Sequence, residues 1–581
     1  MDTTKRWYAS YPAEVAPTFD YPKMNAARLL ADAAAKHPSR PAVDFLGARL
    51  TYAQLLDACY RFANALRTFG VARGDRVAIM LPNCPAAVIA HFGTLMAGAI
   101  VVQTNPLYKA HELKFQLNDA GAKLLVTLDQ LYPRFRPIWS STPVKRVLIA
   151  TIAEQLPWPK SWLYPLKLKR DKQFVRVPYE GDVYGFREAL AAAPSDPAMA
   201  EADATEDVAL LQYTGGTTGV AKGVMLTHYN LVANAYQSLH WQYRSIEGEE
   251  KYLAALPLFH VFGLTVLMNQ AALHAGELIL LPRFEPETVL RTIQRKKPTI
   301  FPGAPTMYVA LINHPKRERY DLSSIRICVS GAAPLPLEVQ ERFEALSGSR
   351  LVEGYGLTEA SPVTHANPIW GKRKIGSIGL PFPDTDAKIV DPDTGEELPP
   401  GEVGELAVRG PQVMKGYWNR PDETALALRD GWLYTGDMGT MDEEGFFTIV
   451  DRKKDLIIAG GFNIYPREIE EVLYEHPAVK EAVVAGVPDA YRGETVKAYV
   501  VLRDGANVTA AALEAYCRDM LAAYKVPRQF EFRDELPKTM IGKVLRRALI
   551  EEERAKAASA AAAPPPDGAR EEKPNGDPRG E

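Results

Sequence analysis

Short apolar runs alternate with helix-like segments along most of this chain, from about residue 29 to residue 450. The runs RVAIML, AKLLVTL, VALLQY, ELILL and IRICVSG have the length and composition of buried strands. Strands that alternate with helices are typical of α/β proteins with largely parallel sheets. Between residues 375 and 450, Gly, Pro and Asp separate short strands such as GELAVRG and GFFTIV, which predicts a β-rich subdomain.

The chain has 581 residues, which is too long for a single ordinary core, so we expect at least two domains. After DRKKD the pattern predicts a compact unit of helix PREIEEVLYEHP, strands VKEAVVAGVP and KAYVVL, and helix AAALEAYCRDML. We therefore predict a large α/β domain over residues 1–452 and a small α+β domain over residues 453–555. Beyond Glu552 the chain is rich in Ala, Pro, Gly and charge, and we expect a disordered tail over residues 556–581.

Charge and cysteine content exclude several classes of protein. The formal net charge of -3 argues against a general nucleic-acid binder. The four cysteines lie far apart without CxxC spacing, which argues against a disulfide framework or zinc site and fits a reducing cytoplasm. The N-terminal MDTTKRWYASYPAEVAP has no apolar core, so we expect no secretory signal.

The apolar stretch from Ala86 to Val102 is almost long enough to span a bilayer. However, Asn83 and Pro85 look like a helix start, and Gly98 looks like a helix stop. The following AIVVQT is β-branched like a buried strand. We interpret the stretch as a core helix followed by a core strand.

The stretch YTGGTTGVAKG, residues 213–223, follows the predicted strand VALLQY. Glycines let backbone N–H groups converge on an anion, Thr214, Thr217 and Thr218 add hydroxyl donors, and Lys222 adds a positive charge. The spacing differs from the Walker pattern, because Lys222 neither follows a glycine directly nor precedes Ser or Thr. The pattern alone predicts a polyphosphate cradle, with a flexible loop as the alternative.

Four later motifs offer further groups for a nucleotide. In EGYGLTEASP, Tyr355 could stack on a base and Glu359 could hold Mg²⁺. LYTGD ends in Asp437, which could accept hydrogen bonds from a ribose diol, and Arg452 follows in DRKKDLIIAGGFNIYP. LPKTMIGKVLRR places Lys543 in a glycine-containing loop before the last helix. Each motif alone is a weak signal, because such residues are usually surface or turn residues.

Taken in order, YTGGTTGVAKG, LPLFHVFG, EGYGLTE, GWLYTGD, DRKKDLIIAGGFNIYP and PKTMIGK resemble the motifs of the adenylate-forming acyl-CoA synthetases. The resemblance extends from about Ala27 to Arg554 and is greatest to bacterial long-chain fatty-acid–CoA ligases. It implies an N-terminal AMP-binding (adenylation) domain with a small, mobile C-terminal domain. It also implies ATP, Mg²⁺ and CoA as cofactor and co-substrates.

The resemblance implies two half-reactions. In the first, a fatty carboxylate attacks the α-phosphate of ATP, and Lys543 bridges the two anions. The residues that it assigns to ATP and AMP are Thr214, Gly215, Gly216, Thr217, Thr218, Gly219, Lys222, Gly331, Ala332, Glu353, Gly354, Tyr355, Gly356, Thr358, Asp437 and Arg452, with Glu359 on the metal.

In the second half-reaction, the thiol of CoA attacks the acyl-AMP. The resemblance implies that the C-terminal domain rotates about a hinge at Lys454, which withdraws Lys543. Gly460, Gly461 and Phe462 then come to the site, where the glycines let the pantetheine arm pass. Apart from this context, Lys454 would be a solvated surface charge.

The acyl chain is expected to bind an apolar pocket. Residues 256–275 contain no Asp or Glu, whereas relatives that activate amino acids usually keep an acid here. Gly356 stands where acetate-activating relatives carry a Trp that closes the pocket, and His260 is a gate or orienting residue in relatives, or otherwise a core histidine. The residues expected to line the pocket are Phe259, Gly303, Ala304 and Gly356, although FPGAPTMYVAL could also be ordinary core helix.

The segment PWPKSWLYPLKLKRDKQF, residues 157–174, interleaves aromatic and cationic residues that suit a bilayer headgroup region. Its alternative is a solvated connecting loop, and Pro157, Pro159 and Pro165 argue against one continuous amphipathic helix. We expect a cytoplasmic enzyme with peripheral membrane contact, and the resemblance makes a homodimer plausible.

The sequence therefore predicts a long-chain fatty-acid–CoA ligase. One alternative is a CoA ligase for aromatic or medium-chain acids, or a luciferase-like oxygenase; another is an acyl-AMP ligase that delivers to a carrier protein. A non-catalytic lipid-binding protein is the alternative of a different class. Six polar residues argue against it, because a dead site has no chemical need for them: Lys222, Glu359, Asp437, Arg452, Lys454 and Lys543.

Overall fold

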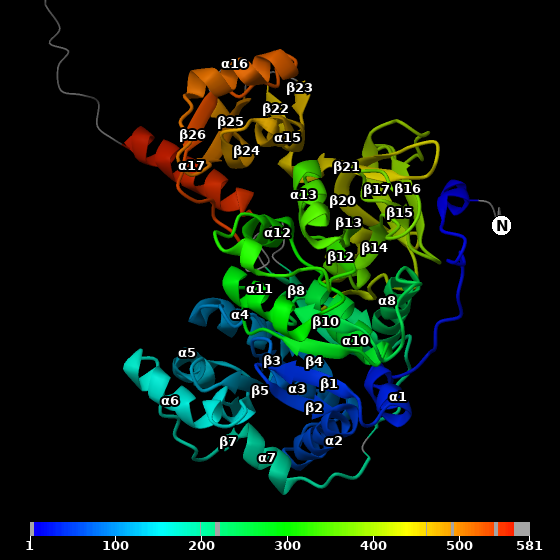
Figure 1. The fold of residues 1–581 in the computed structure, drawn as a ribbon, viewed down its shortest axis with the longest axis vertical. Coiled ribbons are helices and arrows are strands. Elements are labelled where there is room, and N and C mark those ends of the chain that lie inside the picture. The colour runs from blue at the N-terminus through cyan, green and yellow to red at the C-terminus, as the bar shows by residue number, and fades with distance from the viewer. Residues whose placement is uncertain are drawn as a thin grey trace, which may run out of the picture. The chain divides into compact units, whose positions relative to one another are not determined.

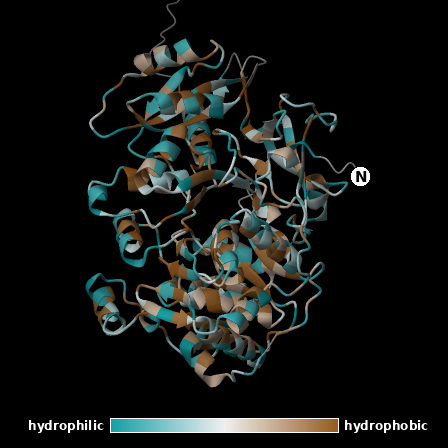
Figure 2. Cartoon of the chain, turned by 45° about the vertical axis from the view of Figure 1, so that its right-hand side comes forward, coloured by the Kyte–Doolittle hydropathy of each residue, from teal (hydrophilic) through white to brown (hydrophobic). Residues whose placement is uncertain are grey.

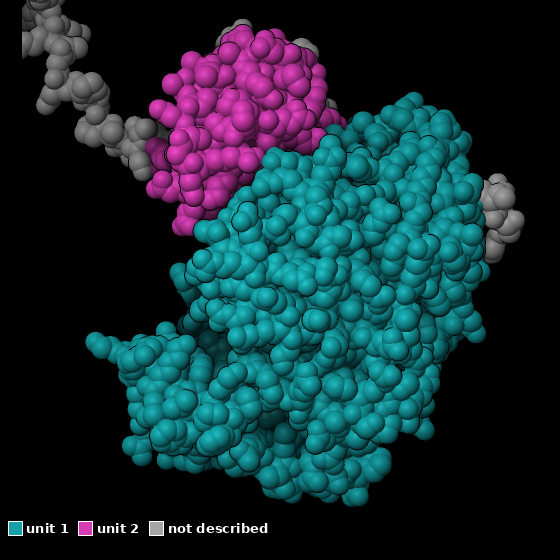
Figure 3. Space-filling model, viewed as in Figure 1, with its two compact units in different colours: residues 1–454, 540–543 teal, residues 455–539, 544–581 magenta. Residues whose placement is uncertain are grey.

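The computed structural model describes residues 5–197, 199–214, 221–459, 462–489, 493–539 and 544–562. The chain forms two compact units, the first up to Lys454 and the second beginning at Asp455 (Figure 3). Figure 1 shows mixed α/β architecture in both. The predicted α/β fold class with parallel-rich sheets is confirmed.

The largest sheet of the first unit has eight strands in the order β18-β9-β8-β4-β3-β5-β6-β7. Its six strands from β8 to β7 are mutually parallel, whereas β9 and β18 are antiparallel additions. The strands are β18 (Gly416–Tyr417), β9 (Lys222–Thr227), β8 (Val208–Thr214), β4 (Ile100–Gln103), β3 (Arg76–Met80), β5 (Ala122–Leu128), β6 (Arg146–Ala150) and β7 (Val183–Gly185).

Two four-stranded sheets complete the α/β part. The first contains β10 (Lys251–Ala254), β11 (Glu277–Leu280), β1 (Pro41–Phe45) and β2 (Ala48–Thr51). The second contains β12 (Ile327–Ser330), β13 (Arg350–Gly356), β14 (Val363–Ala366) and β15 (Leu380–Pro381).

An antiparallel sheet follows in the chain, as the Gly- and Pro-rich texture predicts. It contains β16 (Asp386–Val390), β17 (Gly404–Arg409), β20 (Trp432–Met441), β19 (Leu428–Arg429) and β21 (Phe447–Arg452).

The helices of the first unit are α1 (Arg28–Lys36), α2 (Tyr52–Thr68), α3 (Pro85–Met96), α4 (Ala110–Ala120), α5 (Tyr132–Phe135), α6 (Lys160–Arg170), α7 (Phe186–Ala192), α8 (His228–His240), α9 (Val261–Gly263), α10 (Gln270–Leu273), α11 (Pro286–Lys296), α12 (Pro305–Ile312), α13 (Leu337–Ser347) and α14 (Pro421–Ala427). A π-helical turn, Leu264–Asn269, joins α9 to α10. Apolar residues gather in the strands, and many peripheral helices are hydrophilic (Figure 2).

The second unit has its own sheet of β23 (Phe462–Ile464), β22 (Ile457–Ala459), β25 (Gly493–Leu502), β24 (Val479–Asp489) and β26 (Gln529–Phe532). Its helices are α15 (Pro466–Glu475), α16 (Ala510–Met520) and α17 (Arg546–Ala562). Its hydrophobic clusters draw only on residues of this unit, between Ile457 and Ile550. Helix α17 extends past residue 556, where we expected the tail to begin, and residues 563–581 lie outside the described part.

The apolar stretch from Ala86 to Val102 is a core helix and a core strand, as predicted. Every residue of α3 is buried, and Pro85 occupies its first turn. Gly98, with φ +76°, turns the chain into β4. Among the described residues, no helix is long and apolar enough to cross a membrane.

The prediction that prolines prevent one continuous helix over residues 157–174 holds at Pro157 and Pro159, which precede the helix, and is wrong at Pro165. Helix α6 runs from Lys160 to Arg170 with Pro165 inside it. Proline removes one backbone hydrogen bond. Because most of α6 is exposed, water can satisfy the carbonyl that this leaves without a partner.

Among the described residues of the first unit, the buried histidines are His91, His228, His274 and His365, and burial lowers the pKa of each and favours its neutral form. Burial lowers the pKa of His91 and His365 to about 3 and that of His228 to about 4. The ring of His228 accepts a hydrogen bond at Nδ1 from the backbone N–H of Ala26 (3.0 Å), which requires this nitrogen to be unprotonated.

We expect a His228→Asn variant to lose part of the acid sensitivity of folding. The unfolded chain protonates this histidine below its ordinary pKa of 6.5, and the folded chain does so only near 4, so stability falls as pH drops through this window. Between pH 7 and pH 5 the loss amounts to about 2 kcal/mol for this residue. Urea denaturation at both pH values measures the free energy of unfolding, and its difference between pH 7 and pH 5 should be correspondingly smaller in the variant. An unchanged difference would contradict the assignment of His228 as a buried neutral group.

Candidate active site

The glycine-rich stretch connects two paired strands. Strands β8 and β9 are antiparallel neighbours, and their register places Thr214 opposite Lys222. The loop that they enclose includes Gly215, Gly216, Thr217, Thr218 and Gly219, which lie outside the described residues. The hairpin therefore brings the two ends of the predicted phosphate loop together.

Lys222 lies between an acid and an aromatic ring. Its ammonium forms an ion pair with Glu423, in the first turn of α14, and lies 5.1 Å from the centre of the Tyr417 ring. Burial lowers the pKa of Lys222, while the nearby Glu359 carboxylate acts in the opposite sense. This cation is thus held close to the predicted metal ligand.

Glu359 is fixed from two sides. It belongs to a 3-10 turn, Thr358–Ala360, that follows β13. Its Oε1 accepts a hydrogen bond from the hydroxyl of Tyr417 (2.8 Å), and its carbonyl accepts one from the N–H of Met414 (2.7 Å). Burial and Glu359 together raise the pKa of Tyr417, so this phenol stays a donor.

A magnesium ion would fit this carboxylate. Mg²⁺ typically takes one or two carboxylates together with phosphate oxygens and water. Among the residues that the structure describes, no group of three or more His, Cys, Asp or Glu forms a cage of its own. Glu359 would therefore share the ion with a bound polyphosphate.

Tyr417 and Glu423 are site residues that the sequence analysis missed. They come from the segment GYWNRPDET, which has the appearance of a surface turn. Strand β18 pairs with β9, with Tyr417 opposite Val224, and this pairing carries both residues to Lys222. An aromatic residue and an acid in a short strand were the available signals, although neither reveals its partner.

A Glu423→Gln variant is expected to bind ATP more tightly. The predicted binding of phosphate to Lys222 requires the phosphates to displace Glu423, so removing this competitor should lower KM for ATP about 2- to 5-fold, given the strength of partly exposed pairs. Initial rates over a range of ATP concentrations measure the change. Asp422→Asn is the matched control, because it removes an equal charge from the adjacent position; equal effects of both variants would refute a specific pairing.

Three predicted nucleotide residues meet on Asp437. The Tyr355 hydroxyl donates to its Oδ2 (2.6 Å), and Arg452 Nε lies 3.3 Å from its Oδ1. Strands β20 and β21 create this arrangement, because their register places Asp437 opposite Arg452. Burial raises the pKa of the Tyr355 hydroxyl, and the neighbouring Asp437 carboxylate raises it further.

The loop after β12 lies against β13. Gly331 donates its N–H to the carbonyl of Gly303 (3.1 Å), and Ala332 adopts a positive φ of +69°. A Cβ at Gly331 would meet the Phe262 ring at 3.0 Å and the Gly354 carbonyl at 3.4 Å. Glycine here lets the loop approach both, which aligns one predicted wall of the adenine site.

Glu353 has a structural partner. This buried residue accepts a hydrogen bond from the backbone N–H of Leu335 at Oε2 (3.2 Å). Its carboxylate thus holds the end of the loop that contains Gly331. We expect Glu353 to shape the adenine site through this loop.

The segment LPLFHVFG is held by hydrogen bonds on both sides. Gln212 of β8 donates to the carbonyl of Phe259 (3.1 Å), and Thr265 donates to the carbonyl of Ser361 (2.6 Å). His260 caps α9, with Nδ1 accepting from the N–H of Phe262 (3.3 Å). The segment therefore bridges the phosphate hairpin and the loop that follows β13.

Asn83 also positions this segment. The structure starts α3 after Cys84, so Asn83 is not its cap. Instead, the Asn83 amide donates to the carbonyl of Leu256 (2.8 Å), and its oxygen accepts from the N–H of Leu258 (2.8 Å).

The other predicted pocket residues lie beside the adenine wall. Gly303 donates to the carbonyl of Val329 (3.1 Å), and its α-carbon faces the ring of Tyr308. Ala304, just before α12, is buried. Phe259 is buried as well. These positions remain a predicted lining for an acyl chain.

Gly356 has a backbone reason to be glycine. It pairs with Val363 of β14, and a Cβ added here would overlap the carbonyl oxygen of Pro362. The expectation that this glycine simply leaves pocket space open therefore misses a constraint, because a side chain would first have to move the adjoining strand.

We expect Gly356→Ala to destabilise the first unit. Relief of the overlap with Pro362 must displace β13 or β14, and such overpacking typically costs about 1–3 kcal/mol. Thermal unfolding followed by circular dichroism should show a lower midpoint. A midpoint equal to that of the unchanged protein would mean that the strands adjust freely.

The remaining predicted residues lie at the boundary of the two units, in the second unit or outside the described residues. Lys454 lies in a 3-10 turn, Lys453–Asp455, at the boundary between the two compact units. Phe462 begins β23 of the second unit. Gly460, Gly461 and Lys543 lie outside the described residues. Their roles stay predictions.

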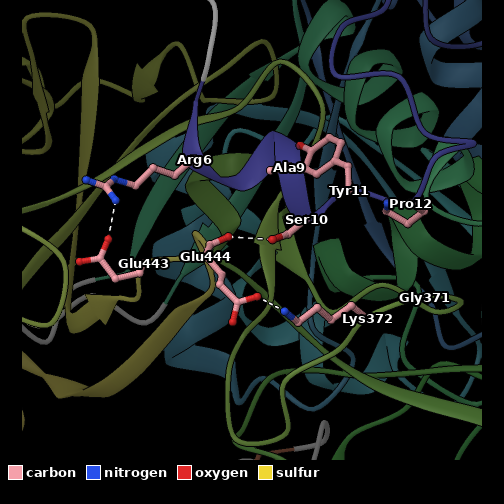
Figure 4. A pocket seen from close by; sticks show the side chains of 9 residues that line it. All are labelled: Arg6, Ala9, Ser10, Tyr11, Pro12, Gly371, Lys372, Glu443 and Glu444. Carbon is pink, nitrogen blue, oxygen red and sulfur yellow. Dashed lines mark hydrogen bonds and ion pairs between the residues drawn. The ribbon is translucent and has the colours of Figure 1, made fainter.

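A surface cavity of about 430 Å³ lies elsewhere in the first unit (Figure 4). Arg6 pairs there with Glu443, and Lys372 pairs with Glu444. No predicted site residue lines this cavity. Because its charges neutralise one another, we do not assign it to the active site.

Comparison with known proteins identifies the family. Residues 30–418 match the family model "AMP-binding enzyme", and residues 468–543 match "AMP-binding enzyme C-terminal domain". The chain belongs to the AMP-binding enzyme family. The long-chain-fatty-acid–CoA ligase of Bacillus subtilis is 53% identical over 95% of this chain and 98% of its own length. That of Escherichia coli is 42% identical over 94% and 98%.

Solved structures agree with this assignment. The anthranilate CoA ligase AuaEII, crystallised with anthranoyl-AMP, is similar with a TM-score of 0.83 and 28% identity. The match covers 92% of this chain and 99% of that one. Family and fold thus extend over nearly the whole chain.

Proposed function

We propose that this protein is a long-chain-fatty-acid–CoA ligase that forms acyl-AMP from a fatty acid and ATP and then acyl-CoA. The observation that carries the proposal is the meeting of Lys222 and Glu359 beside the glycine-rich hairpin of an AMP-binding enzyme. The long-chain preference is supported by the 53% identity to the Bacillus subtilis ligase. The absence of Asp and Glu from residues 256–275 also favours an uncharged acyl chain.

In the proposed first step, a carboxylate oxygen of the acid bonds to the α-phosphorus of ATP, and the bond to the β-phosphate breaks, releasing pyrophosphate. Positive charge must bring the two anions together. Lys222 and the hairpin loop hold the β- and γ-phosphates, Thr358 contacts the α-phosphate, and Lys543 bridges the reacting groups. Mg²⁺, held by Glu359, would neutralise phosphate charge.

The rest of the nucleotide is proposed to lie along the strand ends. Asp437 and Arg452 bind the ribose. Tyr355 and the loop at Gly331 and Ala332 enclose the adenine. The hydrogen bond from Tyr355 to Asp437 supports this assignment, because it aligns the aromatic and acidic groups before ATP arrives.

In the proposed second step, the sulfur of CoA bonds to the acyl carbon, the bond to AMP breaks, and AMP leaves with its electron pair. Lys454 acts as the hinge that exchanges Lys543 for the CoA-binding residues Gly460, Gly461 and Phe462. The position of Lys454 at the boundary between the two compact units supports a hinge role.

The enzyme is proposed to act in the cytoplasm, at the inner face of the membrane, because long acyl chains partition into bilayers. A homodimer belongs to the proposal on the ground of the resemblance to relatives. Light scattering coupled to size exclusion would test it.

Product analysis by mass spectrometry tests the function. The protein is incubated with Mg·ATP, CoA and an equimolar mixture of straight-chain acids from four to twenty carbons, with benzoate and cinnamate added. Acyl-CoA, AMP and pyrophosphate centred on long chains would support the proposal. Benzoyl- or cinnamoyl-CoA as main product would favour an aromatic-acid ligase. Acyl-AMP without acyl-CoA would favour delivery to a carrier protein.

A further inference from the structure

Helix α6 is covered by protein on only one side. Of its residues from Lys160 to Arg170, only Leu168 is buried. Trp162 is 68% exposed, Leu163 48% and Leu166 49%. Helices on globular proteins normally turn their apolar side chains inward. Helix α6 instead presents large apolar side chains to solvent.

The exposed apolar residues share one side of the helix. Trp162 and Leu166 are four residues apart, and Leu163 and Leu166 are three apart, which places them together on one face. Leu168 points to the opposite side, because two residues separate it from Leu166 by about 200° at 3.6 residues per turn. The helix thus anchors through Leu168 and displays Trp162, Leu163 and Leu166.

Two further exposed aromatic residues flank the helix in sequence. Trp158, just before the helix, is 85% exposed, and Phe174, just after it, is 47% exposed. Elsewhere in the described chain, large exposed apolar residues are scattered. Scattered residues need no explanation, but a contiguous apolar group marks an interaction site. We call Trp158, Trp162, Leu163, Leu166 and Phe174 the α6 surface.

The α6 surface is bordered by positive charge. Within residues 157–174 a single acid, Asp171, pairs with Arg170 (3.0 Å). The ammonium of Lys169 lies 5.1 Å from the centre of the Phe174 ring. The cations of the segment are Lys160, Lys167, Lys169, Arg170 and Lys172.

We propose that the α6 surface docks on the headgroup region of an anionic lipid bilayer. Tryptophan, with an apolar ring and a polar N–H, prefers the membrane interface. Lysine and arginine side chains reach along an apolar face and place their charges at lipid phosphates. Figure 1 shows α6 at the outer edge of the first unit. Membrane contact is part of the proposed function, on which this inference rests. The inference adds which residues make the contact and which lipid charge they prefer.

Co-sedimentation with vesicles tests the docking surface. The full-length protein is mixed with vesicles of phosphatidylcholine alone or with one third phosphatidylglycerol, without ATP, CoA or fatty acid. We expect binding to the anionic vesicles only. Each cation near an anionic surface contributes about fivefold to binding, so the double variant Lys167→Gln, Lys169→Gln should bind the anionic vesicles about 25-fold more weakly. Trp162→Glu with Leu166→Glu should weaken binding at least 10-fold.

Ile246→Glu is the control, because Ile246 is 51% exposed outside the α6 surface and should leave vesicle binding unchanged. Octanoyl-CoA formation in solution, without vesicles, is assayed in parallel. Two outcomes overturn the docking surface alone, provided that acyl-CoA still forms. In the first, the α6 variants bind the vesicles as well as the unchanged protein does. In the second, the unchanged protein does not bind anionic vesicles. Vesicle binding without acyl-CoA formation overturns the proposed function alone. If the glutamate variants turn a dimer into a monomer, α6 is a subunit interface and the docking proposal fails.

Discussion

Lys543→Ala is expected to lose the formation of acyl-AMP but to keep the transfer of a supplied acyl-AMP to CoA. In the first step the fatty carboxylate and the α-phosphate repel each other, and the lysine is proposed to supply the charge that bridges them. Loss of one such electrostatic contact at a transition state typically lowers the rate about 10²- to 10³-fold. Pyrophosphate release measures the first step, and release of AMP from synthetic acyl-AMP with CoA measures the second.

Lys538→Ala provides the matched control. Lys538 belongs to the same motif but forms an ion pair with Glu481 within the second unit. It should retain both half-reactions. An equal loss of both steps in the Lys543 variant would indicate general damage, and undiminished acyl-AMP formation would remove Lys543 from the mechanism.

Glu359→Gln is expected to lower kcat/KM for ATP about 10²- to 10³-fold, because the site would lose the charge that is proposed to bind Mg²⁺. The substitution keeps the shape of the side chain and an oxygen that can still accept from the Tyr417 hydroxyl. Pyrophosphate release measured over a range of Mg²⁺ concentrations should show a need for much more metal.

Tyr417→Phe separates positioning from metal binding. It removes the 2.8 Å hydrogen bond and leaves the Glu359 charge in place. A hydrogen bond from a neutral donor to a charged acceptor contributes about 1.5–3 kcal/mol. The expected loss of kcat/KM for ATP is therefore smaller than for Glu359→Gln, about 10- to 100-fold. If Glu359→Gln kept the metal dependence of the unchanged protein, another group would have to hold the ion.

The parallel strands could be predicted because a buried strand can be recognised from its own residues. VALLQY becomes β8 and AKLLVTL becomes β5, since a strand covered on both faces is apolar throughout. Helix α6 could not be predicted in the same way. Pro165 normally interrupts a helix, and the solvent exposure that makes it tolerable depends on what packs nearby.

The site could be predicted only where its residues share a motif. Thr214 and Lys222 flank one loop, so the hairpin had to bring them together. Tyr417 and Glu359 are 58 positions apart, and their hydrogen bond depends on the pairing of β18 with β9. No local pattern reveals which acid faces a given lysine, which is why Glu423 was missed.

Gly356 shows a different limit. Comparison with relatives suggested space for an acyl chain, whereas the carbonyl of Pro362 gives a reason that concerns only the backbone. A glycine can satisfy both demands at once, and sequence alone does not separate them.

The boundary after Lys454 separates two complete cores. In the part of the chain that the structure describes, no sheet crosses it, and the hydrophobic clusters of the second unit contain no residue before Ile457. A gene divided at this peptide bond would therefore encode two polypeptides that each contain everything needed to bury their own apolar side chains. Activity in such a pair would become dependent on protein concentration, because the proposed rearrangement within one chain would become a binding equilibrium that can be titrated.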